Sequence, residues 1–135
     1  DKNFNIANKD NFFDTVLTFR NSHNWLDKGK AEKVYQSLNK VLKKGGILGV
    51  VQHRNFDDSD KNFFKGYVKE QFLIELIEKQ GFKLIDKSEI NSNPKDKKNY
   101  DKGVWALPPR LADGFKDKYL KIGESDRMTL KFKKQ

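Results

Sequence analysis

The sequence lacks cysteine and has only two histidines among 135 residues. Without cysteine the chain has no disulfide framework, no thiolate zinc site and no cysteine nucleophile, and two histidines leave little for a histidine-rich site, so we predict no metal. No apolar run approaches the ~18 residues of a membrane-spanning helix, so we also predict no membrane span. The polar first ten residues do not show the basic and then apolar pattern of a secretory leader.

Arginine is scarce in a strongly basic chain. The net charge is +9, from 28 basic and 19 acidic residues, yet only four of the basic residues are arginine. The lysines are spread from Lys2 to Lys134 and form no basic stripe beside aromatic side chains. This pattern favours a solvated lysine surface, with a site for nucleic acid or another polyanion as the less favoured alternative. The length suits one domain over residues 1–135.

Hydrophobic patterns in the first half predict a strand–helix–strand unit. Residues 14–19 (DTVLTF) form a β-branched and aromatic run that predicts a buried strand, and the polar residues 20–24 (RNSHN) mark its end. In residues 30–43, apolar side chains recur at three and four residue steps, which predicts a helix stopped by two glycines. Residues 47–52 (ILGVVQ) predict a second strand. Continuous apolar strands of this kind favour a parallel sheet covered on both faces.

The second half predicts one more helix and two more strands. Residues 54–66 are acidic and aromatic and predict a loop, and a helix follows over about residues 69–80. The alternating residues 82–90 and the final residues 128–132 predict strands. Between them lies the excursion 91–126, which is far longer than the usual ~4 to 6 residue connection and therefore predicts a binding loop or lid.

Several segments resemble one enzyme family. FDTVL at 13–17, LKKGGIL at 42–48 and KQGF at 79–82 resemble the FDxV, LKPGGxL and AGF segments before or within strands four to six of class I S-adenosylmethionine-dependent methyltransferases. Lys44 replaces the proline of the second segment. Five further segments resemble, more specifically, a group of bacterial predicted methyltransferases of unassigned substrate. They are TFRNSHNW at 18–25, GVVQHR at 49–54, NSNPKD at 91–96, GVWALPP at 103–109 and GESDRM at 123–128.

The resemblance implies an α/β fold that is the C-terminal half of a Rossmann-like methyltransferase. The chain would supply strands four to seven, with the last strand antiparallel, and flanking helices. The function implied is that of part of an S-adenosylmethionine-dependent methyltransferase that acts on a small molecule. The alternative is a non-catalytic α/β module that binds a protein partner or nucleic acid.

The cofactor-binding motif of this family has no counterpart in the sequence. In such folds the cofactor is held by a glycine-rich loop after strand one and by an acidic residue closing strand two, and both would lie before Asp1. We therefore expect a truncated sequence, a fragment or a subunit completed by another chain. Alone, the chain would be inactive and would bind S-adenosylmethionine weakly or not at all.

Polar residues after the first two predicted strands are the main site candidates, because ligands of open α/β sheets bind at the carboxyl edge. The resemblance places Arg20 and Asn21 beside the methionine moiety of the cofactor, although local turn bonds would also explain them. His53 ends a strand at the same edge and is a candidate general base, with anchoring of a loop as an equal alternative. His23 is the second catalytic candidate.

The candidate substrate-binding residues lie mainly in the excursion. For Trp105, walling a pocket competes with covering the core, and for Glu124 and Arg127, substrate contact competes with an ion pair that pins the last strand. The complete set is Asn24, Trp25, Asn91, Asn93, Lys95, Trp105, Glu124 and Arg127.

Strand four is central in the complete fold, so residues 14–19 would leave one edge unpaired, and an unpaired apolar edge recruits another strand. We expect a homodimer formed through this edge, pairing with a missing N-terminal half, or coverage by residues 4–7 folded back. The other partner would be a small-molecule methyl acceptor, with no membrane involved. The expected location is the cytoplasm by default, since any leader peptide would precede Asp1.

Overall fold

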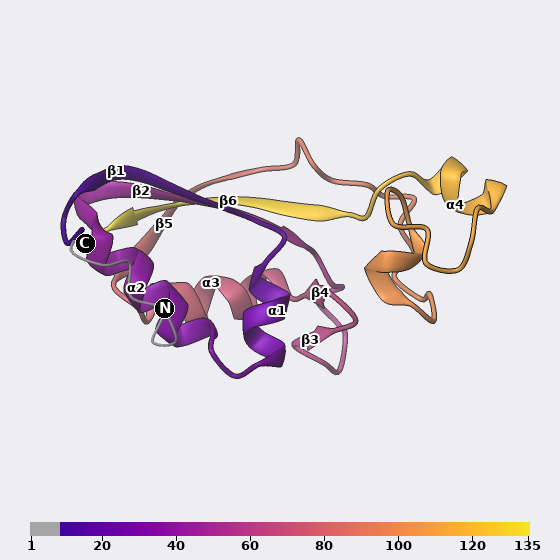
Figure 1. Cartoon of the computed structure of the whole chain (residues 1–135), viewed down its shortest axis with the longest axis horizontal. Helices are drawn as coiled ribbons and strands as arrows, with labels where there is room; N and C mark the ends of the chain where they lie inside the picture. The colour runs from indigo at the N-terminus through magenta and orange to yellow at the C-terminus, as the bar shows by residue number, and fades with distance from the viewer. Residues whose placement is uncertain (1–8) are drawn as a thin grey trace.

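A mixed sheet of four strands organises the chain, and the computed structural model describes it over residues 9–135. The strands are β1 (Phe13–Phe19), β2 (Leu42–His53), β5 (Phe82–Ser88) and β6 (Arg127–Lys134), in the order β1-β2-β6-β5. β1 and β2 are parallel, whereas β6 runs antiparallel to both of its neighbours (Figure 1). This topology confirms the predicted α/β fold with an inserted antiparallel last strand.

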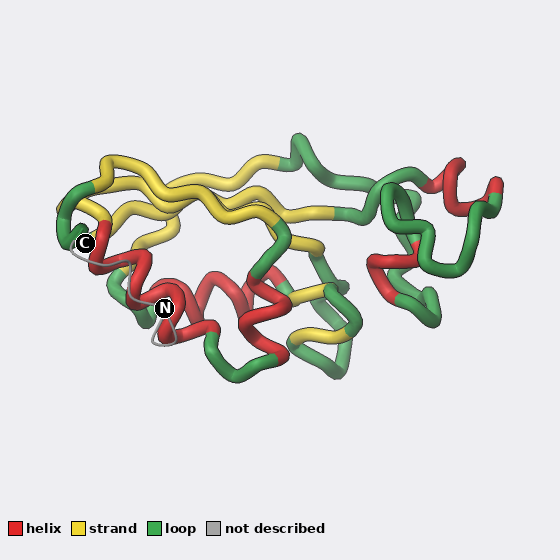
Figure 2. The backbone as a smooth tube through the Cα atoms, viewed as in Figure 1, coloured by secondary structure: helices red, strands yellow, loops and turns green. Residues whose placement is uncertain are grey.

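Helices lie against one face of this sheet (Figures 1 and 2). They are α1 (Ser22–Asp27), α2 (Ala31–Val41) and α3 (Glu70–Glu78). Alternate residues of a strand point to opposite faces, so one set of β2 and β6 side chains faces the helices. The resulting core contains Tyr35, Leu48, Val50, Leu73, Ile77, Met128, Leu130 and Phe132.

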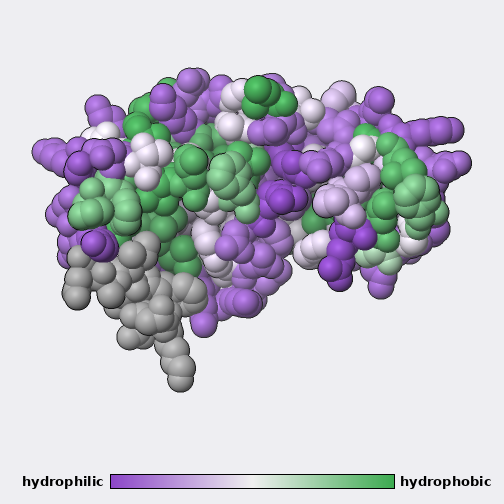
Figure 3. All heavy atoms as spheres, turned by 45° about the horizontal axis from the view of Figure 1, so that its top comes forward, coloured by the Kyte–Doolittle hydropathy of each residue, from purple (hydrophilic) through white to green (hydrophobic). Residues whose placement is uncertain are grey.

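The opposite face of the sheet is open in the described part of the chain, which corrects the expectation of a sheet covered on both faces. Leu17 and Phe19 of β1 are 59% and 61% exposed. A shallow, mainly apolar groove of about 360 Å³ runs across all four strands, and apolar atoms gather on this side in Figure 3. Gly49 leaves room there for Leu17, because a Cβ atom at this position would lie 2.6 Å from the end of the Leu17 side chain and would displace it.

Three local features differ from the sequence-based expectation. The polar residues after β1 enter helix α1, in which the buried Ser22 hydroxyl forms a 2.7 Å hydrogen bond with the Tyr35 hydroxyl. β2 begins at Leu42 and contains both glycines of the predicted turn. The expected loop at residues 54–66 leads into a small hairpin formed by β3 (Phe63–Phe64) and β4 (Tyr67–Val68).

Residues 91–126, here called the lobe, project beyond one end of the sheet (Figure 1). They contain a 3-10 helix η1 (Gly103–Ala106) and helix α4 (Asp117–Ile122). Ala106, Leu107 and Tyr119 form a small separate core in the lobe. None of the helices in the described residues has the length and apolar character of a membrane span. The predicted cover of the β1 edge by residues 4–7 lies outside the described residues.

Candidate functional site

A cavity of about 270 Å³ lies where the carboxyl ends of β1 and β2 meet the lobe. Two features of the backbone create it. The Arg20 amide donates to the Val51 carbonyl at 2.7 Å, and Arg20 itself has φ 53°, so the chain turns sharply from β1 into α1. β6 begins where β2 ends, with Arg127 opposite His53. Residues from four segments therefore surround one space.

The cavity brings together six of the twelve predicted site residues: Arg20, His23, Asn24, His53, Trp105 and Arg127. Seven further residues complete the lining: Phe19, Val104, Leu107, Pro108, Pro109, Arg110 and Ser125. Among residues 9–135, no three His, Cys, Asp or Glu residues are grouped so as to hold a metal ion.

The two histidines form one wall of the cavity. Their ring centroids are 5.5 Å apart, and the Trp105 ring meets His23 edge-on at 5.7 Å. The Gln52 amide donates to the Gly66 carbonyl at 2.9 Å and lies 3.2 Å from His23 Nδ1. Because that amide nitrogen can only donate, Nδ1 accepts and the neutral ring carries its hydrogen on Nε2. Burial lowers the pKa of His23, which favours this neutral form.

His53 is also buried and is held by Ser125. The distance from His53 Nδ1 to Ser125 Oγ is 2.5 Å. Burial lowers the pKa of His53 to about 3, and the nearby His23, Arg127 and Arg20 add to this effect. His53 is therefore neutral at pH 7. When Nδ1 carries the hydrogen and donates to Ser125, Nε2 has a free lone pair and is able to accept a proton.

The six remaining predicted residues lie outside the cavity lining. Asn21 accepts a hydrogen bond from Asn24 at 2.9 Å, and Trp25 packs edge-on against Tyr35 at 5.5 Å beside the core. Asn91 donates to the Thr129 hydroxyl at 2.8 Å, Asn93 donates to the Glu124 carbonyl at 2.6 Å, and the Lys95 side chain is exposed.

Glu124 forms a 2.6 Å ion pair with Arg127, as the structural alternative for these two residues predicted. These contacts stabilise local structure. A cofactor contact by Asn21 and substrate contacts by the other five residues stay predictions.

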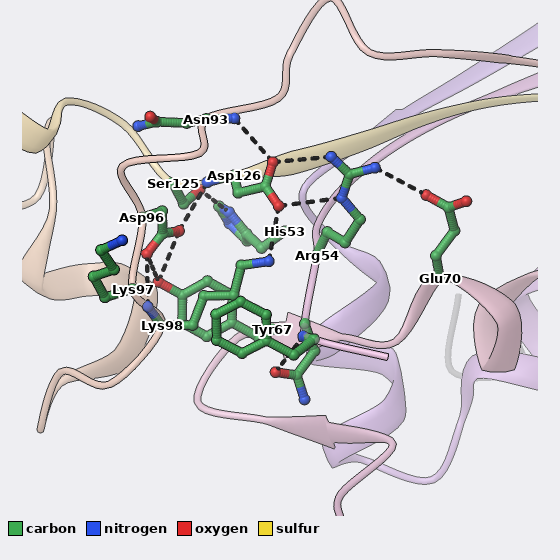
Figure 4. Close-up of polar contacts among 12 residues, drawn as sticks. His53, Arg54, Tyr67, Glu70, Asn93, Asp96, Lys97, Lys98, Ser125 and Asp126 are labelled. Atoms are coloured by element: carbon green, nitrogen blue, oxygen red, sulfur yellow. Dashed lines mark hydrogen bonds and ion pairs between the residues drawn. The ribbon is translucent and has the colours of Figure 1, made fainter. Parts of the chain in front are cut away.

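Beside the cavity lies a second polar cluster, which we call the Arg54 cluster (Figure 4). Arg54 contacts Glu70, Glu89 and Asp126 at 3.2, 2.6 and 3.0 Å. Asp126 also accepts from Lys98 Nζ at 2.8 Å and from the Asn93 amide at 2.9 Å. Burial alone would raise the pKa of Asp126, but the hydrogen bonds from Arg54 and Lys98 lower it. The cluster ties the lobe to the sheet.

Arg110 is a cavity residue that sequence reasoning did not single out, and Ser125 was considered there only as part of the polar turn 124–127 before the last strand. Ser125 belongs to the polar segment GESDRM, but only the antiparallel pairing of β6 with β2 places it against His53, 72 residues away in the chain. Arg110 directly follows Pro108 and Pro109, and its position next to these predicted wall residues was the signal in the sequence that could have identified it.

No family model matches the sequence, and no curated protein sequence matches it. Solved structures do match the fold. The 4+2-cyclase SpnF superposes with a TM-score of 0.63 at 17% identity over 97% of this chain. An S-adenosylmethionine-dependent methyltransferase from Methanosarcina mazei gives 0.59 at 12% identity over 99% of this chain. The 1,6-didemethyltoxoflavin N1-methyltransferase of Burkholderia thailandensis gives 0.59 at 11% identity over 98%.

The chain spans about half the length of these proteins, since it covers 53%, 65% and 48% of them. Similarity at such low identity shows the fold alone: a mixed α/β sheet that matches about half of a Rossmann-like methyltransferase domain. One of the three is named as a cyclase, so the fold does not fix the reaction.

The described residues do not by themselves fit the adenosine of S-adenosylmethionine. The two parallel strands β1 and β2 are followed by Arg20 and Arg54, whereas a ribose is usually held by a carboxylate at a strand end and a phosphate or amino-acid moiety by a glycine-rich turn. Residues 9–135 offer neither feature at this edge. They provide instead the cavity of about 270 Å³ described above.

Proposed function

We propose that this chain is the acceptor-binding part of an S-adenosylmethionine-dependent methyltransferase for a small molecule. The observation that carries the proposal is the cavity at the carboxyl edge of β1 and β2, where open α/β sheets bind ligands. It contains a buried neutral histidine beside cationic side chains. The fold shared with two methyltransferases of known structure supports the proposal.

The residues of the chain would orient the acceptor and remove its proton. Trp105, Pro108 and Pro109 would hold the acceptor against the ends of the strands. His53 would take the acceptor proton at Nε2 while Nδ1 donates to Ser125. S-adenosylmethionine supplies the methyl group in enzymes of this kind. A further polypeptide segment beside β1 would hold that cofactor, since the described residues lack its motifs.

Calorimetric titration with S-adenosylhomocysteine tests the cofactor. The 135-residue chain should show no micromolar binding, whereas the protein expressed together with the sequence encoded upstream of Asp1 should bind. Micromolar binding by the 135-residue chain would contradict the proposal that another segment holds the cofactor. Absence of binding by the longer protein would contradict the proposed methyltransferase function itself.

Methyl transfer by the longer protein tests the role of His53. His53→Gln should lower turnover by about 10²- to 10⁴-fold, the usual contribution of a positioned general base, while S-adenosylhomocysteine affinity is kept. Lys44→Gln is the matched control, because this exposed residue lies far from the cavity lining and should have no effect. Unchanged turnover in His53→Gln would remove His53 from the mechanism.

A further inference from the structure

Arginine and lysine are distributed very differently around the cavity. Three of the four arginines in the sequence line it, and none of the lysines within residues 9–135 does. The three arginines come from separate segments: Arg20 follows β1, Arg110 belongs to the lobe, and Arg127 begins β6. In a chain with so many lysines, this selection of arginine points to a site that needs the geometry of the guanidinium group.

The guanidinium group differs from an ammonium group in its planar fork of donors, which fits a carboxylate or a phosphate with two parallel hydrogen bonds. No Asp or Glu of the described residues lines the cavity. Among residues 9–135, Arg20 and Arg110 form no ion pair. Arg127 has a single carboxylate partner, Glu124, and its Nε is buried without a hydrogen-bond acceptor. The cavity therefore has hydrogen-bond donors without acceptors, and positive charges without carboxylate partners, among the described residues.

Apolar side chains line the cavity together with Asn24, Ser125 and the two histidines. Trp105 is 38% exposed and lines the cavity with Phe19, Pro108 and Pro109. Aromatic side chains of this kind pack well against a planar ring. The volume of about 270 Å³ is just below the ~300 Å³ at which drug-sized pockets begin, so the ligand must be small.

We propose that the cavity binds a small molecule that carries a carboxylate or phosphate group on a planar apolar body. That this molecule is the methyl acceptor rests on the proposed function. That the cavity binds such a molecule is independent of the proposed function. The anion would lie between Arg20 and Arg127, with the planar part against Trp105.

Such a ligand would also make His53 a better base. The groups that face His53 are His23 from α1, Arg20 after β1, and Ser125 and Arg127 at the start of β6. The two arginines help to lower the pKa of His53. An anion bound between them would offset their charge and raise that pKa toward the range of a useful base. Binding of the ligand and activation of the base would thus be coupled.

The test titrates the full 135-residue chain with benzoate, phenyl phosphate and the neutral analogue benzamide. Binding is followed through the NMR signals of the His53 ring and the Trp105 indole. At least one of the two anions should bind saturably and at least tenfold more tightly than benzamide, and the better anion identifies the group. Equal binding of benzamide, or no saturable binding of either anion, would overturn the proposal.

Two variants locate the anion. Arg20→Gln and Arg110→Gln change exposed side chains, so the fold should be kept. Arg20→Gln should weaken anion binding tenfold or more, the typical loss of a charge-assisted hydrogen bond, and Arg110→Gln should weaken it less. Unchanged anion binding in Arg20→Gln would overturn the proposal. Lys44→Gln removes the same charge outside the cavity and should change nothing. Equal weakening by Lys44→Gln would mean that only net charge attracts the anion, which overturns the proposal.

A last titration separates the acceptor from the cofactor. In the longer protein, S-adenosylhomocysteine and the preferred anion should bind together. Mutual exclusion would mean that the arginines hold the carboxylate of the cofactor, which would overturn this inference and leave the proposed function intact. If the anion binds but S-adenosylhomocysteine does not, the proposed function would be overturned and this inference would stand.

Discussion

The Arg54 cluster and the cavity are two polar regions at the same end of the sheet, and they differ in whether their arginines have carboxylate partners. Arg54 contacts three carboxylates, whereas Arg20 and Arg110 of the cavity form no ion pair within residues 9–135. A buried charge that is fully paired contributes to the fold, and an unmet charge beside a cavity is available to a ligand. Charge balance, more than burial, therefore separates the structural cluster from the candidate site.

The separation follows from the alternation of side chains along two strands. His53 lines the cavity, and the next residue, Arg54, is the centre of the ion-pair cluster. On the facing chain, Ser125 bonds His53, Asp126 bonds Arg54, and Arg127 lines the cavity again. Because successive residues of an extended chain point to opposite sides, one antiparallel pairing builds both regions.

The largest expected effect is loss of stability when the Arg54 cluster is broken. Asp126→Asn removes the central carboxylate, whose side chain is 8% exposed, and leaves Arg54 and Lys98 partly unpaired. The free energy of unfolding should fall by about 3–5 kcal/mol, measured by urea denaturation. Glu124→Gln breaks the ion pair of Arg127 with a half-exposed carboxylate and should cost less than about 1 kcal/mol. Equal losses would show that the two regions do not differ in their structural role.

A smaller effect, of pH on stability, has its origin in the cavity. The pKa of His53 falls from 6.5 to about 3 on folding, so the unfolded chain takes up a proton near pH 6.5 while the folded chain does not. Stability should therefore be complete above pH 6.5 and be lost as the pH falls toward 3. Between pH 7 and 5 the loss from His53 should be about 2 kcal/mol.

Denaturation of the wild type and of His53→Gln at several pH values measures this loss. In the variant, the loss of unfolding free energy between pH 7 and 5 should be smaller by the contribution of His53. The lowered pKa of Asp126 acts in a separate window, because an aspartate in the unfolded chain titrates near ~3.9. Its contribution is present above that value and is lost only as the pH falls further. An identical profile for both proteins between pH 7 and 5 would contradict the buried neutral state of His53.

The sequence predicted the sheet well and the site in part, for physical reasons. Residues 14–19 are rich in β-branched and aromatic side chains and residues 47–52 are largely apolar, so local pattern was enough to place β1 and β2 and the polar residues at their carboxyl ends. Helix α1 was missed because its polar residues are stabilised by tertiary contacts, such as that of Ser22 with Tyr35. The partners of His53 and Arg54 in the lobe depend on the register of β6 against β2, which no local pattern reveals.

A still smaller effect is expected for Trp105→Ala. Trp105 is 38% exposed and lies at the rim of the cavity, so its removal should leave stability nearly unchanged. Binding of benzoate or phenyl phosphate should weaken by roughly tenfold, about 1.4 kcal/mol, because the planar part of the ligand loses its packing partner. In the longer protein, S-adenosylhomocysteine affinity should be kept. If the anion binds the variant as well as the wild type, Trp105 covers the core and does not bind the ligand.

The smallest effect on folding, and the last prediction, concerns the outer edge of β1, where backbone groups have no partner strand within residues 9–135. In this part of the chain β1 ends the sheet, and Leu17 and Phe19 beside that edge are largely exposed. An apolar unpaired edge recruits a second strand, so we expect the 135-residue chain to self-associate at tens of micromolar, most simply as a two-fold dimer through β1. Leu17→Lys places a charge on this surface and should abolish association, while the stability of the monomer changes by no more than about 0.5 kcal/mol. Sedimentation of both proteins over a concentration series decides the matter: a wild type that stays monomeric, with fast amide exchange at Val16 and Phe19, would show that unmet backbone groups at this edge are satisfied by water alone.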